Sequence, residues 1–266
     1  MNRGALYFLI TLLVSACATS PTGRSQFLLY TEESAIAASR QAYTEMLAPL
    51  EKEGKIDTNP LLKDRVLNIT SRIVAQAVQS RPETNNWNWE IKIIDDPETV
   101  NAWAMAGGKM AVYTGLVEKI NPNDDELAQV IGHEIAHALA KHSAEKMSIA
   151  TATQVGITAV ASMTKNQVTM TGTTLLAAIA VTLPNSRTME SEADRIGIEL
   201  AAKAGYNPNA AVSLWQEMVG EGGSSPPQFL STHPNPTKRQ ETLRALVPEM
   251  MPYYTARGMR PVYPLN

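Results

Sequence analysis

Three of the four histidines in this 266-residue chain lie in the stretch VIGHEIAHALAKH, residues 130–142. His133 and His137 are four residues apart, so on a helix both imidazoles leave the same face one turn apart. Two ring nitrogens placed in this way can reach one ion at about 2.0–2.1 Å, the distance that zinc takes. Glu134 lies about 100° around the helix from His133, where it can reach a water molecule. This H-E-x-x-H pattern indicates two zinc ligands and a general base.

The alternative for these residues is a pair of core histidines on an amphipathic helix. The neighbouring side chains do not fit it, because the helix is apolar nearly all round, at Val130, Ile131, Ile135, Ala136, Leu139 and Ala140. A buried helix of this kind carries His, Glu and His only when they have polar partners. We therefore predict one zinc ion per chain as the cofactor.

A catalytic zinc site needs a third protein ligand. The segment NSRTMESEADRIGIEL, residues 185–200, is a predicted helix with three carboxylates. Glu190 and Asp194 are four residues apart and share a face, whereas Glu192 points roughly to the opposite side and is expected in solvent. We predict Glu190 as the third ligand and Asp194 as the residue that orients a ligand imidazole. The alternative is a solvated acidic helix start, where carboxylates also suit the helix dipole.

Helices and a small sheet must hold these residues in place. Hydrophobic spacing and capping signals predict the helices, and alternating β-forming residues predict the strands. Helices are expected over about 31–50, 61–78, 123–147 and 185–200, with a strand at 87–94 and two strands within 100–117 joined at Gly107-Gly108. This order predicts an α+β fold, mostly helical, with a small β-sheet beside the active-site helix.

Two further expectations follow from the helix pattern. On a straight helix over 123–147, His142 faces away from His133 and is predicted in solvent. The apolar segment 147–183 is interrupted by polar residues into pieces too short to span a bilayer. It is expected to form two helices that flank the cleft as a lid, rather than a transmembrane hairpin.

The overall composition, with 44% hydrophobic residues, 18% charged residues and a formal net charge of −3, is that of a globular protein. Nucleic-acid binding would require a clustered basic surface, which this weakly acidic chain does not indicate. We expect no nucleic-acid partner.

The N-terminus has the features of a lipoprotein signal. Residues 4–14 (GALYFLITLLV) are an apolar run too short to span a bilayer as a mature helix, and Ser15-Ala16 then leads into Cys17, the only cysteine. This resembles a bacterial lipobox, in which the signal is removed before the cysteine and the thiol carries a diacylglycerol. The alternative is an ordinary signal peptide with an incidental cysteine. Lipidation of Cys17 is favoured, because a free exposed thiol without a disulfide partner is a liability.

The expected organisation follows from this anchor. By resemblance to lipoprotein sorting, Ala18 after the cysteine implies the outer membrane, with the protein lipid-anchored and facing the periplasm. We predict a signal peptide over 1–16, a lipid-anchored tether over 17–30, a zinc-binding domain over 31–250 and a C-terminal tail over 251–266.

Four motifs together resemble the HtpX/BepA/LoiP type of zinc metallopeptidase, peptidase family M48. They are H-E-I-A-H at 133–137, E-S-E-A-D at 190–194, N-A-W-A-M-A-G-G at 101–108 and S-T-H-P at 231–234. The resemblance covers about residues 30–250, and the short periplasmic lipoprotein members have the closest layout. It implies a gluzincin-like metalloprotease fold with Glu190 as the third ligand. The chain departs in having Ala106 where many relatives have proline, and in lacking the C-terminal helical-repeat domain of BepA-like members, so no partner role that rests on that domain is expected.

The resemblance also implies further site residues. His233 matches the histidine of the T-H-P motif, which lies near the metal. It is expected to polarise the oxyanion or to occupy the open position of zinc in a resting form, and the alternative is a plain loop histidine. In this type of enzyme a strand edge beside the metal binds extended substrate by β-addition. The segment that fits this place, or else is only an outer strand, comprises Lys109, Met110, Ala111, Val112 and Tyr113.

These features predict a zinc metalloendopeptidase of the cell envelope. Its expected substrates are misfolded or unassembled periplasmic and outer-membrane proteins, and its expected membrane contact is the lipid anchor. The alternative is a non-catalytic chaperone or assembly factor for outer-membrane proteins that retains a zinc site. The presence of Glu134 argues against that alternative, since a structural site has no use for a base there.

Overall fold

The computed structural model describes residues 17–163, 183–220, 228–233 and 236–265. The signal peptide expected over 1–16 and part of the helical pair expected within 147–183 lie outside the described residues. Within the described part of the chain, no helix combines the length and the apolar composition needed to cross a membrane.

Local capping signals set the starts of the main helices. Helix α2 (Glu32–Lys52) begins after Thr31, whose side chain accepts a hydrogen bond from the Ser34 N–H. Helix α3 (Pro60–Ser80) follows the N-cap Asn59, and Pro60 takes the first position, where no N–H is needed. Helix α5 (Asp124–Leu139) begins with the expected capping box between Asn123 and Glu126.

The sheet beside the site has three strands in the order β3-β5-β4. Strand β3 (Glu90–Ile94) pairs in parallel with β5 (Lys109–Tyr113), and β4 (Ala102–Met105) pairs antiparallel with β5. The two antiparallel strands form the expected hairpin, since Gly107 and Gly108 both have positive φ (80° and 78°). A Cβ at Gly108 would lie 2.3 Å from the Trp89 ring, so that position also requires glycine for space.

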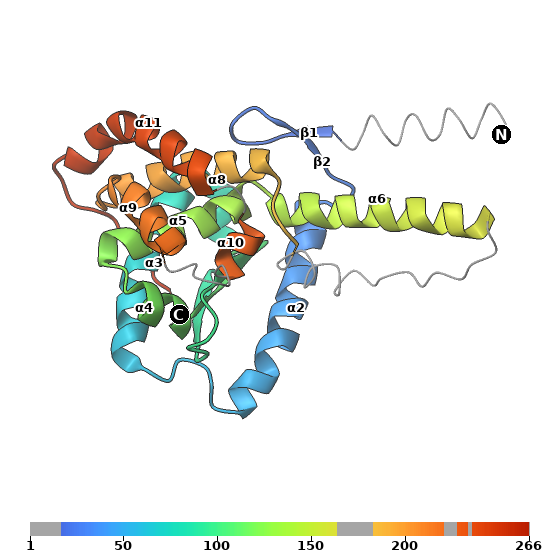
Figure 1. Cartoon of the computed structure of the whole chain (residues 1–266), viewed down its shortest axis with the longest axis horizontal. Coiled ribbons are helices and arrows are strands. Elements are labelled where there is room, and N and C mark those ends of the chain that lie inside the picture. Colours follow the sequence, from blue (N-terminus) through green and yellow to red (C-terminus); the bar gives the residue numbers. More distant parts are fainter. Residues whose placement is uncertain (1–16, 164–182, 221–227, 234–235, 266) are drawn as a thin grey trace.

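Helix α5 lies at the centre of the molecule (Figure 1). Every residue from Glu126 to Leu139 is buried. The helix packs against α3 and β4, against α8 (Arg187–Lys203), and against α9 (Ala210–Gly220). Helix α11 (Pro236–Thr255) covers α8 and α9, and the short helices α4 (Thr114–Ile120), η1 (Pro82–Asn86) and α10 (Gln228–Thr232) complete the body. The fold is therefore mostly helical with a small sheet, as predicted.

The helix expected to run from 123 to about 147 is broken, which corrects that prediction. Helix α5 ends at Leu139, Lys141 has a left-handed backbone (φ 59°), and α6 (His142–Met163) begins at the next residue. Lysine, unlike glycine, is rarely found in the left-handed region of backbone conformation. The contacts around Lys141 must therefore hold the break in place. Helix α6 then runs out sideways from the body (Figure 1).

The segment expected as a tether, residues 17–30, contacts the body of the protein over much of its length. Strands β1 (Cys17–Thr19) and β2 (Ser25–Phe27) pair antiparallel, and we refer to residues 17–27 as the N-terminal hairpin. The hairpin lies beside the base of α6 (Figure 1). At the other end, residues expected as a tail also pack on the domain, because the Tyr263 N–H donates to the Ser71 carbonyl (2.9 Å).

Candidate metal centre

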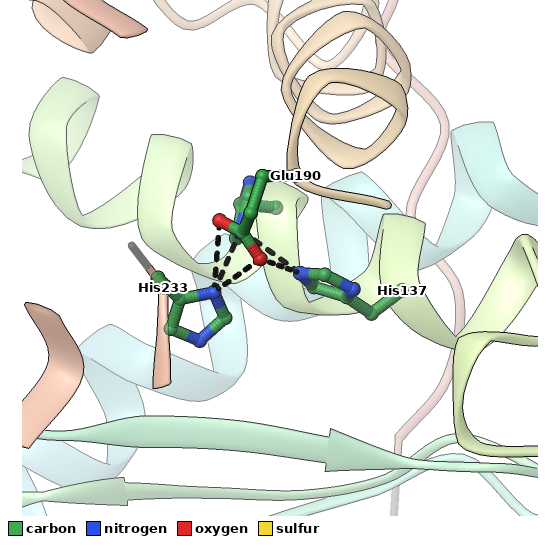
Figure 2. Close-up of side chains that lie close together, drawn as sticks. His137, Glu190 and His233 are labelled. Carbon is green, nitrogen blue, oxygen red and sulfur yellow. Dashed lines mark hydrogen bonds and ion pairs between the residues drawn. The ribbon is translucent and has the colours of Figure 1, made fainter. Parts of the chain in front are cut away.

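Four buried side chains from three elements converge on one point. His133 and His137 come from α5, Glu190 comes from α8, and His233 follows α10. One donor atom of each lies within 4.8 Å of the others, and we call these four residues the donor cluster. In Figure 2 the Glu190 carboxylate points between the rings of His233 and His137, above the strands of the sheet.

The spacing of these atoms fits a tetrahedral ion. The His133 and His137 Nε2 atoms are 3.0 Å apart, and each is 3.4 Å from a Glu190 oxygen. The Nδ1 atom of His233 is 3.2 Å from the His133 Nε2 and 3.0 Å from the Glu190 Oε1. Ligands about 2.0–2.1 Å from zinc at tetrahedral angles are about 3.3 Å from one another. The chain's own atoms therefore form a cage of the size that zinc requires.

A close crossing of α5 and α8 brings Glu190 to the histidines. Gly132 and Gly197 lie backbone to backbone at this crossing. A Cβ on Gly132 would be 2.8 Å from the Gly197 carbonyl oxygen, and a Cβ on Gly197 would be 2.8 Å from the His133 Cα. Larger residues would separate the helices, so these two glycines set the distance between the histidine helix and the carboxylate helix.

Asp194 and Arg239 contact two residues of the donor cluster, His133 and Glu190. Asp194 Oδ1 is 3.1 Å from the His133 Nδ1, which is the position expected for a residue that orients that ring. Arg239 from α11 donates from Nε to Asp194 Oδ2 (2.8 Å) and from Nη1 to Glu190 Oε2 (2.6 Å), and its Nη2 also contacts Asp194. Its guanidinium lies over the Trp215 ring, 3.7 Å from the centroid. Sequence reasoning missed Arg239, because nothing in its spacing from His233 marks it as a partner of two carboxylates.

His142 and Glu192 are not in solvent, which corrects both predictions. His142 is 1% exposed and Glu192 is 5% exposed. The His142 Nδ1 lies 2.7 Å from the His137 Nδ1, and its Nε2 lies 3.1 Å from Glu192 Oε2. The straight-helix projection failed because the left-handed residue Lys141 turns the chain, so that His142 faces back toward His137.

Glu134 faces a small cavity with one oxygen free. Among the described residues, its Oε1 has no hydrogen-bond partner, although His233 Nε2 is 3.4 Å away. The cavity has room for a water, at about 20 Å³, and Glu134, His137 and His233 line it together with Ala102 and Ala104 of β4. Burial raises the pKa of the Glu134 carboxyl above its ordinary value. A raised pKa makes this carboxylate a better proton acceptor than an exposed one.

The environment holds His137 and Glu190 in forms that suit a metal, whereas His133 is held in its protonated form. Burial lowers the pKa of His137 well below its ordinary value, so its imidazole is neutral. Burial alone would raise the pKa of Glu190, but the charges of His233 and Arg239 outweigh it and lower that pKa well below the usual range. For His133, burial and the charge of Arg239 lower the pKa, but hydrogen bonds with Asp194 and Glu190 outweigh both effects and raise the pKa to about 9. Metal binding at His133 Nε2 would therefore release a proton.

The strand expected to bind substrate is not an edge strand, which corrects that prediction. Strand β5, with Lys109, Met110, Ala111, Val112 and Tyr113, pairs with β3 on one side and with β4 on the other. Its backbone groups are used on both sides. The edge strands of the sheet are β3 and β4, and of these β4 also borders the cavity beside Glu134.

Comparison with known proteins decides the family. A model of peptidase family M48 matches residues 60–247, which is more than half of the chain. The chain belongs to this family. Zinc is the cofactor of the family, and the donor cluster fits it.

Several known proteins are similar over much of the chain. The bovine (Bos taurus) "Metalloendopeptidase OMA1, mitochondrial" is 30% identical, over 94% of this chain and 50% of the relative. The "Mitochondrial metalloendopeptidase OMA1" of Saccharomyces cerevisiae is 29% identical, over 87% of this chain and 69% of the relative. The "Beta-barrel assembly-enhancing protease" of Escherichia coli K12 is 30% identical, over 73% of this chain and 41% of the relative. The chain thus spans about half the length of the bovine protein, and less of the bacterial one.

Proposed function

We propose that this chain is a zinc-dependent endopeptidase of the cell envelope. The observation that carries the proposal is the Glu134 carboxylate, whose Oε1 accepts no hydrogen bond from the described residues and which lines a cavity with His137 and His233 of the donor cluster and with the edge strand β4. Zinc, when bound, acts as a Lewis acid that polarises a carbonyl and lowers the pKa of water toward about 7. His133, His137 and Glu190 would hold it.

Two residues of the chain then have separate roles in the reaction: Glu134 transfers the proton and His233 stabilises negative charge. Glu134 accepts the proton of the attacking water as the water adds to the scissile carbonyl carbon. It later donates that proton to the nitrogen of the leaving amine as the C–N bond breaks. Burial raises the pKa of Glu134, which makes its carboxylate a stronger base for the first of these steps. His233 has one ring nitrogen toward Glu134 and the other toward Glu190, so once it leaves the donor cluster it is near enough to the site to stabilise the oxyanion.

The described arrangement is a closed form of the site. His233 takes the place of a fourth donor, and the cavity beside Glu134 has room for a water but not for a peptide. Substrate binding therefore requires His233 to leave the donor cluster. The resting-form role expected for His233 is consistent with this arrangement.

Substrate is proposed to bind as an added strand on β4. The Tyr113 N–H donates to the Asn101 carbonyl (3.1 Å), so hydrogen-bonded pairs alternate from Asn101 along the β4–β5 ladder. This alternation directs the N–H and C=O of Ala102 and Ala104 away from β5. The Ala102 N–H already bonds to Asn101 Oδ1, which leaves Ala104 to pair with an incoming backbone. Pairing through backbone groups tolerates many sequences, which suits an enzyme for misfolded chains.

The proposed location and substrates rest on separate support. The lipobox-like residues Val14-Ser15-Ala16 before Cys17 support an outer-membrane lipoprotein that faces the periplasm. The similarity to the "Beta-barrel assembly-enhancing protease" of Escherichia coli K12 supports misfolded or unassembled envelope proteins as substrates. A Cys17→Ser variant should then lose fatty-acid labelling and appear in the soluble periplasmic fraction. A variant that stays labelled and membrane-bound would show that the lipobox assignment is wrong.

The test of the activity is cleavage of casein by Glu134→Gln. Glutamine is close to glutamate in shape but cannot take a proton, so the variant should keep zinc and its melting temperature while cleavage falls by several orders of magnitude. Glu98→Gln is the matched control, because the Glu98 side chain is exposed and its ion pair with Lys119 lies at the surface. Equal cleavage by Glu134→Gln and the wild type would exclude Glu134 as the base. No cleavage by the zinc-loaded wild type would favour the chaperone alternative.

A further inference from the structure

The second zinc ligand, His137, has a hydrogen-bond partner that is itself an imidazole. The Nδ1 atoms of His137 and His142 are 2.7 Å apart, so one of them must carry the proton of a hydrogen bond. His137 must leave Nε2 unprotonated to bind a metal, which places its proton on Nδ1. His142 Nδ1 is then the acceptor, and its own proton lies on Nε2, which donates to Glu192 Oε2 (3.1 Å). One arrangement of protons therefore satisfies the whole chain of contacts.

The carboxylate at the end of this chain is held by the N-terminal hairpin. Thr22 donates to Glu192 Oε1 (2.6 Å), and Arg24 donates from Nε to Glu192 Oε2 (3.0 Å). Arg24 also donates two hydrogen bonds to Glu145 of α6 (2.8 and 2.6 Å). Glu145 and Glu192 are both buried, so without Arg24 two buried carboxylates would lose the cation that they share.

The hairpin also holds the break between α5 and α6. The Gln26 Nε2 donates to the Ala140 carbonyl (2.7 Å) and to Glu145 Oε2 (2.9 Å). Ala140 immediately precedes the left-handed residue Lys141, whose turn brings His142 back toward His137. The position of His142 therefore depends on a segment more than a hundred residues earlier in the chain.

The same arrangement occurs on the other histidine. His133 contacts Asp194, and Asp194 contacts Arg239. His137 contacts Glu192 through His142, and Glu192 contacts Arg24. Helix α8 thus supplies one carboxylate that contacts His133 directly and one that reaches His137 through His142, and an arginine from elsewhere in the chain holds each carboxylate.

We propose that His142, Glu192 and Arg24 are positioning residues for the zinc ligand His137, and that the N-terminal hairpin is thereby a structural part of the metal centre. This rests on the zinc site of the proposed function but not on its peptidase activity. Partners of this kind fix the ring orientation and tautomer of a ligand, and their loss typically weakens metal binding by about 10–100-fold. If the chain is anchored at Cys17, the anchor lies directly before the segment that supports the metal centre.

The test is made on the full chain with Zn²⁺ and Co²⁺ as probes. Arg24→Gln and Glu192→Gln should each weaken zinc binding by about 10–100-fold in competition with a chelator. Both should also shift the visible absorption bands of bound Co²⁺, which report ligand geometry. Glu199→Gln is the matched control, since Glu199 lies on the same helix and pairs with Lys203. Wild-type zinc affinity and an unchanged Co²⁺ spectrum in both variants, even with a lower melting temperature, would reduce the network to packing and overturn the proposal.

A second pair of variants covers the case in which loss of a buried charge prevents folding. His142→Asn retains an acceptor near the position of Nδ1, whereas His142→Leu has none. Zinc affinity should fall in the order wild type, His142→Asn, His142→Leu. Equal affinity of the two variants would overturn the proposal. Because zinc affinity is measured without substrate, a failure of casein cleavage in the wild type would count against the proposed function and leave this test intact.

Discussion

The backbone of Gly197 lies directly against the backbone of His133. A Cβ on Gly197 would be 2.8 Å from both the N and the Cα of His133, at the crossing of α5 and α8. His133 is the donor nearest to this crossing, and α8 carries Glu190 two turns earlier. The separation of the two helices therefore sets the size of the zinc cage.

Gly197→Ala tests this relationship. Backbone atoms cannot move aside as a side chain can, so the added methyl group should push the helices apart. We expect a loss of about 1–3 kcal/mol in the free energy of unfolding, as for other overpacked cores, and weaker zinc binding. Urea unfolding and chelator competition measure the two effects. Ser191→Ala, at an exposed position on the same helix, is the control, and a Gly197→Ala variant that matches it in both assays would contradict the argument.

Much of the site could be predicted from the sequence because its geometry is local. The spacing of His133 and His137 requires only one turn of helix, and the same reasoning places Glu190 and Asp194 on one face of α8. The structure brings all four to one region, as expected from helical periodicity. The pattern of strands and capping residues likewise predicted the order of the elements.

The errors concern contacts that no local pattern encodes. His142 turns inward because a single left-handed residue, Lys141, breaks the helix, and the contacts that hold this break come from Gln26. Glu192 is buried because the N-terminal hairpin covers it. Strand β5 is central because β3 pairs with it in parallel across a connection that the hairpin signal does not reveal. Each error arises from an interaction between segments distant in sequence.

The two carboxylates beside the histidines should differ in their effect on zinc. Glu190→Gln removes a charged donor from the cage and should leave the protein largely without zinc. Asp194→Asn leaves the cage complete but weakens the contact with His133, so zinc affinity or activity should fall by about 10–100-fold. Zinc content after dialysis, measured on both variants, separates the roles. Full zinc occupancy in Glu190→Gln would show that another group, such as His233, replaces the glutamate as third ligand.

Arg239 should contribute more to the free energy of unfolding in the metal-free protein than in the zinc-loaded protein. Arg239→Met leaves Glu190 and Asp194 buried without their cation, and breaking a buried pair typically costs about 3–5 kcal/mol. Zinc binding restores a positive charge beside Glu190, so the loss should be smaller with zinc. Urea unfolding in chelator and in excess zinc compares the two. The surface variant Arg195→Met controls for lost charge, and an equal loss in both conditions would disprove this account of Arg239.

Ala104→Pro tests the substrate edge of the sheet. The Ala104 N–H points away from β5, so proline removes a donor from the free edge without removing a hydrogen bond of the ladder. One lost hydrogen bond to substrate is worth about 0.5–1.5 kcal/mol, so KM for a peptide should rise by about 2–12-fold. Zinc content should stay unchanged. An unaltered KM in Ala104→Pro would exclude pairing at this position.

The free energy of unfolding should depend on pH through Lys146, a lysine beside the site. Its side chain lines the cavity with Glu134 and donates to the Leu183 carbonyl (3.2 Å), and burial lowers its pKa to about 8. The ordinary value is about 10.4, so between pH 8 and 10.4 the unfolded chain binds more protons than the folded chain. The free energy of unfolding contributed by Lys146 therefore rises with pH through this window.

At pH 7 the folded protein holds a charged lysine at a cost, and Lys146→Met should be more stable than the wild type by about 1–3 kcal/mol. That advantage should shrink toward zero by about pH 10.5. Urea unfolding of both proteins in excess zinc at pH 7 and pH 10 measures the difference, with Lys119→Met as the surface control. A difference that stays constant across this range would show that the ammonium of Lys146 is not desolvated in the folded protein.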